Sequence, residues 1–524
     1  MMKTTEHRSL GRARLLLAVG ILGWLGVEAR LVQIQLTRSD ELARDVVIDR
    51  TEHIVAQRGD IRDRHGLPLA VSILAAQSEH ELAFRGPYGR DYPMGDATGL
   101  VTGLVGRALP YGFVGKEGVE LQYEPFLRGD DGVARYIISG SGRVCTFEPL
   151  RIDRLPRPGR SVSLTIDAVY QALAHVEAEA LRARYNARWT GILVMRPTTG
   201  EILAAAASPS ADPEHFQPGT STANPLWARQ FEPGSSFKIV VLAAALERGL
   251  VTPESMIDCE NGAWVTPART WHDTSPLGIV TLRTAVAKSS NIAAAKLGIA
   301  VGASDFTRFA RAMGFGEKTS PHLGAEAPGY LQQPDPRRRS TLAAMAMGQG
   351  LSVTGVQLLN AFCCVANGGQ LMEPLLAYGV DGVAPTPVRR AISPSTSQTL
   401  AGLLRGVVDG GTGAAARHPS VAVAGKTGTA QVAGRGGVGY VEGSYIATFA
   451  GFFPVDSPEV AILVIAAEPR GSYYGGQICA PVFRRMVDLM IGAPGGCLYP
   501  VLASGLSAAP LNGWVSAPSD VGNG

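Results

Sequence analysis

Lys238 follows Ser235 by three residues in the stretch FEPGSSFKIV, and lysine is rare in this chain, which has seven lysines against 41 arginines. Residues i and i+3 of a helix lie on one face, so the lysine amine can point at the serine hydroxyl. A serine hydroxyl needs a base to become a good nucleophile. Arginine cannot be that base because its pKa stays above ~12, whereas burial or neighbouring positive charge can deprotonate a lysine. The pair predicts a serine nucleophile with a lysine base.

Two further segments carry residues of the same chemical kind. AVAKSSNIAAA places Ser289 and Asn291 before an alanine-rich helix, and AGKTGTA places Lys426 on an expected strand. Each segment also has an ordinary explanation. Ser-x-x-Lys occurs by chance in a capped helix with a surface lysine, the second segment fits a helix cap, and the third fits a strand with an exposed lysine. Their occurrence together and in this order favours a single site, in which three remote segments converge on the Ser235 hydroxyl.

The elements around these residues have to bring them together. A Pro-Gly turn precedes an expected helix that begins at Ser235 and stops at Gly249, and the N–H groups at its start favour a developing oxyanion. The other expected elements are a β-hairpin, a mainly helical region, three strands and a last helix, at 190–209, about 211–405, 420–432, 444–455, 459–469 and about 480–491. Strands at both ends with helices between predict an α+β fold, with one sheet assembled from distant segments beside a helical lobe.

The N-terminal segment is basic and then apolar. The run LLLAVGILGWLGV, Leu15 to Val27, is only ~20 Å long as a helix, which alone suits a cleavable signal peptide. However, the helical pattern continues, Glu28 and Arg30 can reach the far interface, and no evident cleavage site follows. These features favour an uncleaved transmembrane signal anchor over 15–36. The basic start, 1–14, then stays in the cytoplasm, and the remainder lies on the periplasmic or extracytoplasmic side.

The remaining chain divides at LPRPGRS, where two prolines favour an extended linker. Before it, 37–158 is a mixed, glycine-rich region without an evident catalytic set. After it, a strand leads to Asp167 as a helix N-cap, and 159–494 holds the expected chemistry. The tail at 495–524 is rich in Gly, Pro, Ser and Ala with a single charged residue, a composition that predicts disorder.

Composition excludes several classes of function. A net charge of +3, without a basic run interleaved with aromatics, argues against nucleic-acid binding. The six cysteines lack Cys-x-x-Cys spacing with a matching histidine pair, so no metal site is expected, and their redox state stays open. The glycine-rich stretch GRGGVGY, 434–440, joins two expected strands and does not open a helix, unlike a nucleotide-binding loop. We therefore expect no cofactor.

Ser-x-x-Lys, Ser-x-Asn and Lys-Thr-Gly in this order mark penicillin-binding proteins and serine β-lactamases. The chain resembles the class B penicillin-binding proteins, which are monofunctional peptidoglycan D,D-transpeptidases. RGDIRDRHGLPLA and GKEGVELQYEPFLRGDDG are similar to pedestal motifs of that family, and FEPGSSFK, MGQGLSVTGVQLLNAF, VVDGGTGAAA, AGKTGTAQV and YYGGQICAPVF to its transpeptidase segments. The resemblance implies a penicillin-binding/β-lactamase-like domain, with an antiparallel sheet and an all-helical lobe. A single transmembrane helix and a β-rich pedestal domain would precede it.

The resemblance also implies an acyl-transfer reaction. Ser235 would attack the penultimate D-alanine carbonyl of a stem peptide and release the terminal D-alanine, with Lys238 taking its proton. Ser289 and Asn291 would continue the proton relay and hold the substrate amide. An amine of a neighbouring stem peptide would then resolve the acyl-enzyme and make a cross-link. β-Lactam antibiotics would acylate the same serine.

The third segment would bind the substrate. By the same resemblance, Lys426, Thr427 and Thr429 would hold the terminal carboxylate, and the N–H groups of Ser235 and Thr429 would form the oxyanion hole. Gly428 would leave the strand edge uncrowded, so that a peptide can lie along it as an added strand.

The subtype is less sharply indicated. Ser-Ser-Asn and GSYYGGQICAPVF look more like septal division (FtsI-like) enzymes, whereas rod-elongation and sporulation members are the alternatives. The septal interpretation implies a SEDS-type lipid II polymerase and other division proteins as partners. Two rivals share the motifs: a β-lactamase or D,D-carboxypeptidase, which passes the acyl group to water, and a non-catalytic β-lactam-binding scaffold. The pair His272-Asp273 fits a loop hydrogen bond better than a catalytic role.

Overall fold

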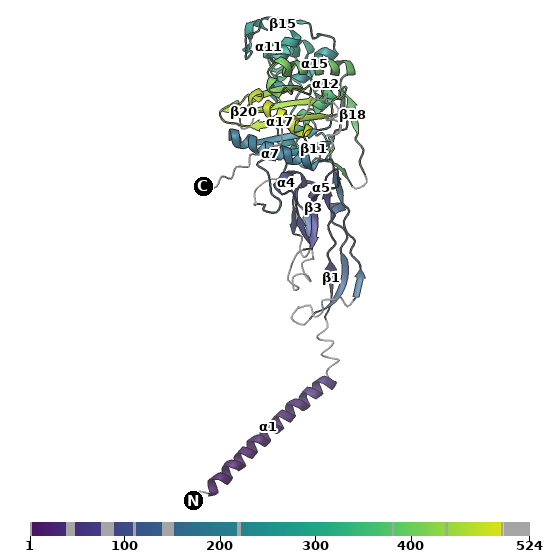
Figure 1. The fold of residues 1–524 in the computed structure, drawn as a ribbon, viewed down its shortest axis with the longest axis vertical. Coiled ribbons are helices and arrows are strands. Elements are labelled where there is room, and N and C mark those ends of the chain that lie inside the picture. The colour runs from purple at the N-terminus through teal and green to yellow at the C-terminus, as the bar shows by residue number, and fades with distance from the viewer. Residues whose placement is uncertain are drawn as a thin grey trace, which may run out of the picture.

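The computed structural model describes residues 3–37, 48–74, 88–107, 112–138, 151–216, 222–379, 382–434, 439–493 and 496. The chain folds as an α+β protein in which a strand-rich stalk supports a wider body of sheet and helices (Figure 1). The helices α11, α12 and α15 lie at the end of the body far from the N-terminal helix. The expected disordered tail and two cysteines, Cys145 and Cys497, lie outside the described residues. The other four cysteines are buried and free.

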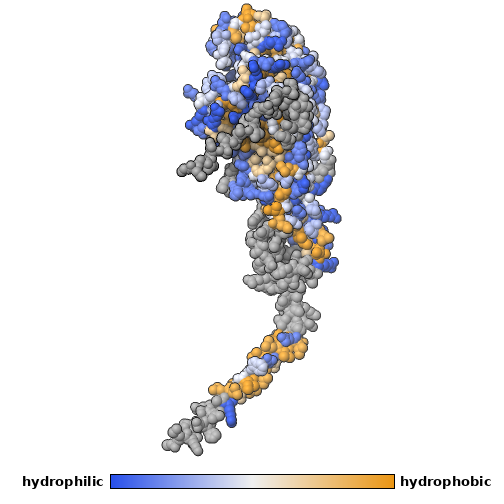
Figure 2. Space-filling view, viewed as in Figure 1, coloured by the Kyte–Doolittle hydropathy of each residue, from blue (hydrophilic) through white to orange (hydrophobic). Residues whose placement is uncertain are grey.

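The N-terminal helix α1 spans Lys3–Thr37. Its segment Arg14–Leu36 is the one helix of the described chain that is long and apolar enough to cross a membrane, by length and composition. The 23 residues of this segment would be about 35 Å long, enough for a ~30 Å hydrocarbon layer. None of this segment is buried against the other described residues, and Figure 2 shows a largely hydrophobic surface along it, interrupted by a few polar patches. This helix suggests a single-pass membrane anchor.

The stalk, called the pedestal here, comprises the described residues between 48 and 158. It holds an antiparallel sheet of order β1-β7-β8 and a small β5-β6 hairpin. The bounds of its strands and helices are β1 Ile48–Ile54, β5 Val105–Arg107, β6 Phe113–Gly115, β7 Gly132–Ile138, β8 Arg151–Arg154, α4 Asp96–Thr102, α5 Gly118–Gln122 and α6 Glu124–Leu127.

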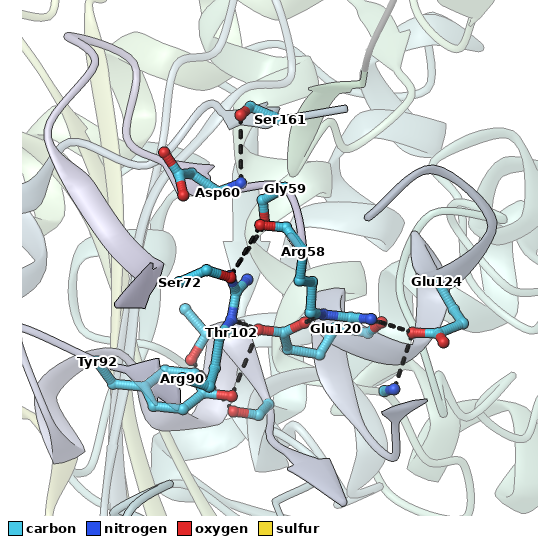
Figure 3. A network of polar contacts seen from close by, with 12 residues as sticks. Arg58, Gly59, Asp60, Ser72, Arg90, Tyr92, Thr102, Glu120, Glu124 and Ser161 are labelled. Carbon is cyan, nitrogen blue, oxygen red and sulfur yellow. Dashed lines mark hydrogen bonds and ion pairs between the residues drawn. The ribbon is translucent and has the colours of Figure 1, made fainter. Parts of the chain in front are cut away.

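A buried ionic network holds the centre of the pedestal together (Figure 3). Arg58 Nε and Arg90 Nε each lie 2.7 Å from a different carboxylate oxygen of Glu120, whose side chain is fully buried. A second acid, Glu124, lies 2.6 Å from Arg58 Nη1, and the Tyr92 hydroxyl donates to Glu120. Because both guanidinium groups face carboxylates, their buried charges are compensated. The two motif segments quoted above, RGDIRDRHGLPLA and GKEGVELQYEPFLRGDDG, thus meet through Arg58 and Glu120.

One sheet joins the pedestal to the rest of the molecule. Its strand order is β17-β9-β2-β3-β4, and β2 of the pedestal pairs in parallel with β9. The bounds of its strands are β2 Ile61–Arg62, β3 Pro68–Leu74, β4 Tyr88–Asp91, β9 Val162–Leu164 and β17 Ala377–Gly379. The segment between β8 and β9 is hydrogen-bonded to the pedestal, with Gly159 N donating to Gln57 O over 2.8 Å. The domain boundary predicted at 158–159 therefore lies next to a sheet that contains strands from both sides of it. The boundary itself stays a prediction.

The body is built on an antiparallel sheet of order β11-β10-β21-β20-β19. The hairpin expected over 190–209 is β10 (Trp189–Met195) and β11 (Ile202–Ser208), and the three later strands are β19 (Ala424–Ala433), β20 (Tyr440–Phe453) and β21 (Val460–Ala467). Strands from the two ends of the region thus form one sheet, as predicted. The strand β19 that carries Lys426 lies at the edge of this sheet, and among the described strands it pairs with β20 alone.

Helices cover both faces of this sheet. Helix α7 (Ala168–Tyr185), capped by the expected Asp167, and α17 (Ala480–Ile491) bury one face, against side chains such as Ile192 and Val464. Leu193 and Leu463 point to the other face, which packs on the helical lobe, because successive side chains of a strand alternate. The lobe comprises α8 Pro225–Ala228, α9 Lys238–Glu247, α10 Leu282–Ala287, α11 Asn291–Val301, α12 Ala303–Ala312, α13 Arg339–Ala346, α14 Gly355–Ala366 and α15 Pro394–Gly410.

The remaining elements are short. They are the 3-10 turns η1 Gly234–Phe237, η2 Glu260–Gly262 and η3 Ala414–Ala416, the strands β12 Met256–Asp258, β13 Ala263–Val265, β14 Thr270–His272, β15 Ile279–Thr281, β16 Gln370–Met372 and β18 Pro387–Arg390, and the helix α16 Gly475–Ile478. Small hairpins such as β13-β14 sit at the rim of the lobe, above the sheet edge.

Candidate active site

Ser235 lies half-buried in a cleft of about 850 Å³ between the helical lobe and the edge strand β19. The turn before it is fixed from two sides. Gly234 adopts φ +54°, and a Cβ there would meet Thr429 O of β19 at 2.6 Å; from the other side, a Cβ on Gly348 would meet Gly234 O at 2.1 Å. Only glycine allows this close approach of three backbones. Ser235 itself lies in the 3-10 turn η1, and the α-helix begins three residues later at Lys238.

Lys238 is buried at the floor of the cleft, with 3% of its surface exposed. Its Nζ donates to Ser289 O at 2.7 Å and Asn291 Oδ1 at 2.8 Å, with Ser290 O at 3.2 Å and Ser289 Oγ at 3.4 Å. The described residues show no hydrogen bond between Lys238 Nζ and Ser235 Oγ. The Lys238 amine is therefore hydrogen-bonded to the second motif, Ser289 to Asn291, and not to Ser235, the serine that it was expected to face.

Burial changes the protonation of this amine. Removal from water lowers the pKa of Lys238 to about 7, and the negative charge of Asp273 opposes that shift. A buried ammonium is costly because it loses its hydration, so the neutral amine becomes accessible near neutral pH. A neutral lysine can accept a proton, as the choice of lysine over arginine at this position predicts.

Lys426 meets the second motif from the opposite side. It is 1% exposed, and its Nζ lies 2.7 Å from Ser289 Oγ. Burial lowers the pKa of Lys426 well below its usual value, and the positive charge of Lys238 lowers it further. The Ser289 hydroxyl is thus within hydrogen-bond distance of two lysine amines, and it can pass a proton between them. Ser289 holds this position with a left-handed backbone, φ +59°.

The third segment lines the cleft as the edge of the sheet. Thr427 and Thr429 face the cleft, and Thr427 Oγ1 is 3.0 Å from Thr412 Oγ1. A Cβ on Gly428 would meet Thr448 Oγ1 at 2.2 Å and Pro233 O at 2.8 Å. Glycine at this position therefore lets β19 lie directly against the turn that carries Ser235, which is a packing reason in addition to the open edge expected from the sequence.

The structure gives Asp273 a larger role than the sequence suggested. Its Oδ1 accepts from Asn291 N at 2.5 Å and from Ile292 N at 3.0 Å, and its Oδ2 accepts from Ser290 Oγ at 2.6 Å. A carboxylate that accepts N–H groups at a helix start stabilises that helix terminus. Asp273 thereby holds the turn at Ser289, and its negative charge raises the pKa of Lys238.

The eight residues predicted from the three motifs gather at one place. Ser235, Ser289, Asn291, Thr427 and Thr429 line the cleft, Lys238 and Lys426 lie beneath it beside Ser289, and Gly428 packs between them and the serine turn. The sequence reasoning did not single out Asp273 as a partner of this set, or Thr412. The sequence predicts only a loop hydrogen bond for Asp273, because its distance along the chain gives no signal of its position.

Comparisons with known proteins agree with this geometry. The penicillin binding protein transpeptidase domain matches residues 190–488. The chain is 30% identical over 414 residues to a probable peptidoglycan D,D-transpeptidase, PbpC, of Pseudomonas aeruginosa, covering 78% of this chain and 70% of that protein. It is 32% identical over 410 residues to stage V sporulation protein D of Bacillus subtilis, covering 75% of this chain and 62% of that protein.

A solved structure shares the fold. Penicillin binding protein 3 of Mycobacterium tuberculosis superposes with a TM-score of 0.72 at 28% identity, covering 84% of this chain and 97% of that one. That protein has also been solved in complex with aztreonam and with ampicillin. The match of a family model over more than half of the chain, together with relatives at least 30% identical over about three quarters of it, shows the family. The chain belongs to the penicillin-binding proteins, and within them to class B.

Proposed function

We propose that this chain is a peptidoglycan D,D-transpeptidase in which Ser235 forms the acyl-enzyme. The observation that carries the proposal is the position of Ser289 Oγ, 2.7 Å from Lys426 Nζ and 3.4 Å from Lys238 Nζ, at the floor of the cleft that holds Ser235. One cleft thus brings together a nucleophile, an amine with a pKa of about 7 that can act as a base, and a hydroxyl that can relay the proton.

The first half of the reaction is acylation. Lys238 takes the proton of Ser235, whose oxygen attacks the carbonyl of the penultimate D-alanine of a stem peptide. Backbone N–H groups of Ser235 and Thr429 stabilise the oxyanion. The proton passes through Lys238 and Ser289 to the nitrogen of the terminal D-alanine, which leaves as the C–N bond breaks. The product is an ester between Ser235 and the shortened peptide.

The edge strand provides the means to bind that peptide. Because β19 pairs only with β20 among the described strands, its other edge can accept the donor peptide as an added strand. Lys426, Thr427 and Thr429 then hold the terminal carboxylate, and Asn291 holds an amide of the substrate. An amine of a second stem peptide attacks the ester and forms the cross-link. β-Lactams acylate Ser235 in the same way.

We further propose septal wall synthesis as the setting, with a SEDS-type lipid II polymerase and other division proteins as partners. Ser-Ser-Asn at 289–291 and the YYGG segment near residue 474 support it. Sporulation is the alternative, favoured by the likeness to stage V sporulation protein D, and rod elongation is the other. A fluorescent fusion would lie at the septum for the first role, in the forespore envelope for the second and along the side wall for the third.

The topology follows from the same proposal. Helix α1 crosses the cytoplasmic membrane once, 1–14 stays inside, the pedestal takes 37–158, and the transpeptidase domain, 159–494, acts on the periplasmic or extracytoplasmic side. Protease added to intact spheroplasts should digest the catalytic domain and spare the N-terminus. Protection of the whole chain would reverse this topology.

Labelling by a fluorescent penicillin tests the chemistry. Ser235→Ala should abolish covalent labelling, while its melting temperature stays that of the wild type. Ser420→Ala, a control at an exposed serine away from the cleft, should label normally. Undiminished labelling of Ser235→Ala would refute the proposal.

Product analysis with donor and acceptor peptides separates cross-linking from carboxypeptidase or β-lactamase activity, since the hydrolases yield no cross-linked product.

A further inference from the structure

The cleft around Ser235 carries charge of one sign. Among its described lining residues the ionisable side chains other than tyrosine are Arg269, His272 and Lys288, and none is acidic. Under the proposed function the terminal carboxylate of the donor goes to Lys426 and its threonine neighbours at the sheet edge. Arg269 and Lys288 stand on the other wall, on the helical lobe, and that reaction assigns them no part. We call these two residues the cationic wall.

The backbone and the side chain of Arg269 are both held in place by neighbouring residues. It lies at the turn of the β13-β14 hairpin, where Thr266 Oγ1 donates to Arg269 O at 2.6 Å and accepts from Arg269 N at 3.2 Å. Its guanidinium carbon lies 4.3 Å above the ring of Trp271, which is 3% exposed. Stacking on a fixed ring limits the rotamers of the side chain, so less entropy is lost when it binds. Within the described chain, no carboxylate pairs with it.

Lys288 presents a second cation to the same cleft. It directly precedes Ser289, it is exposed, and its Nζ donates to Gly410 O at 3.3 Å, the carbonyl at the end of α15. That neutral carbonyl steadies the amine without neutralising it. Glu232, three residues before Ser235, accepts from Gly350 N at 2.9 Å and from the Tyr440 hydroxyl at 3.2 Å, so it is engaged away from this wall. Both cations of the wall are therefore available to a ligand.

We propose that the cationic wall binds a second carboxylate of the peptide substrate, one that is not the terminal D-alanine carboxylate. The inference rests on the proposed function and adds a substrate class to it: stem peptides with a free internal carboxylate are favoured over those in which it is amidated. Guanidinium and ammonium groups recognise carboxylates by charge-assisted hydrogen bonds. A cleft of about 850 Å³ has room for several residues beyond the scissile bond. Either the donor or the acceptor peptide can supply the group.

Matched peptides test the inference on the full-length protein in detergent. Two donors end in D-Ala-D-Ala and differ only in an internal carboxylate or carboxamide, and two acceptor amines differ in the same way. The wild type should acylate from the carboxylate donor, or transfer to the carboxylate acceptor, about fivefold more efficiently, which corresponds to about 1 kcal/mol for a partly exposed pair. The arm that shows the preference identifies the peptide that is recognised.

Variants locate the preference. Arg269→Gln and Lys288→Gln should each lower the ratio between the two peptides toward one, and 0.5 M salt should lower it in the wild type. The control Arg283→Gln removes an exposed arginine that is paired with Glu254 outside the cleft, and it should keep the ratio. A ratio of one in both arms of the wild type, or a ratio that survives both variants, would overturn the inference. Benzylpenicillin carries a single carboxylate, so its failure to label the wild type would instead overturn the proposed function.

Discussion

The pedestal and the active site both bury charged side chains, but they treat the charges in opposite ways. In the pedestal, Arg58 and Arg90 flank the fully buried Glu120, each at 2.7 Å. Beneath the cleft, Lys238 and Lys426 share the hydroxyl of one serine, and their hydrogen-bond acceptors are carbonyl, amide and hydroxyl oxygens. One region pairs unlike charges and the other crowds like charges.

This difference in their neighbours distinguishes the pedestal charges, which stabilise the fold, from the active-site amines, which can take part in a reaction. Where a buried cation faces a carboxylate, the charged form is retained and the pair fixes two segments of chain. Where two buried amines face each other, at least one tends to lose its proton, because like charges raise the cost of ionisation. At the active site, burial lowers the pKa of the base Lys238, and the charge of Lys238 then lowers the pKa of Lys426 further. Removing one member from each region should have opposite consequences.

The largest effect is expected at the base. Lys238→Met removes the proton acceptor but keeps the volume of the side chain, so the rate of penicillin labelling should fall by about 10³-fold. Because burial of the charged amine opposes the hydrogen bonds that it makes, the melting temperature should change little. The control Lys318→Met changes an exposed lysine and should leave the labelling rate unchanged. Labelling within tenfold of the wild type would show that another group is the base.

The matching change in the pedestal should affect stability and spare chemistry. Glu120→Gln leaves two buried guanidinium groups without their shared carboxylate, which should cost about 3–5 kcal/mol of unfolding free energy. Denaturant unfolding measures that loss, while the labelling rate of the folded protein should be unchanged. Asp153→Asn, which removes a surface pair with Arg135 and Arg151, should leave the unfolding midpoint in place. An equal shift in both variants would contradict the comparison.

The pH dependence of acylation should report the crowded amines. With the pKa of Lys238 at about 7, the rate should rise about tenfold per pH unit below that value and level off above it. The free energy of unfolding should also rise with pH. Between pH 7 and the ordinary pKa of lysine, Lys238 is protonated in the unfolded chain and neutral in the folded protein, so the folded state becomes more stable as the pH increases. In Lys238→Met that contribution should vanish. A rate that is flat from pH 5 to 8 would exclude Lys238 as the titrating base.

The smallest effect is expected for Asp273, the carboxylate that lies beside the buried amines of the active site. Asp273→Asn removes the charge that raises the pKa of Lys238 and keeps an acceptor oxygen for the helix start. The midpoint of the pH–rate profile should therefore move to lower pH, with a loss of only a few-fold in the plateau rate. Asp305→Asn, at a half-buried acid of α12 paired with Arg248 and Arg308, should leave the profile unmoved. A shift to higher pH would show that Asp273 acts on the base in another way.

The sequence predicted the parts of the site that depend on local spacing. The alternation of the strands after residue 420 and the helical pattern after Asp167 predicted the sheet and its covering helix. The three short motifs predicted the set of side chains that the structure gathers around Ser235. These predictions rest on residues that lie close together along the chain, where periodicity and spacing carry information.

Contacts between remote segments could not be predicted in that way. Asp273 is 35 residues from Lys238 along the numbering, and only the fold reveals that it caps the helix at Asn291. The direction of the Lys238 amine, toward Ser289 and Asn291, depends on which acceptors the lobe offers once it has packed. Likewise, LPRPGRS looks like a free linker because it contains two prolines, yet its backbone bonds to the pedestal.

The parallel pairing of β2 with β9 has a mechanical consequence. Ile61 and Arg62 of the pedestal are in register with Val162 and Ser163, and β17, from deep within the catalytic part, continues the same sheet. The stalk and the cleft should therefore tilt as one lever rather than swivel about a joint. A sideways displacement of the pedestal would therefore change the position and the orientation of Ser235 relative to its substrate.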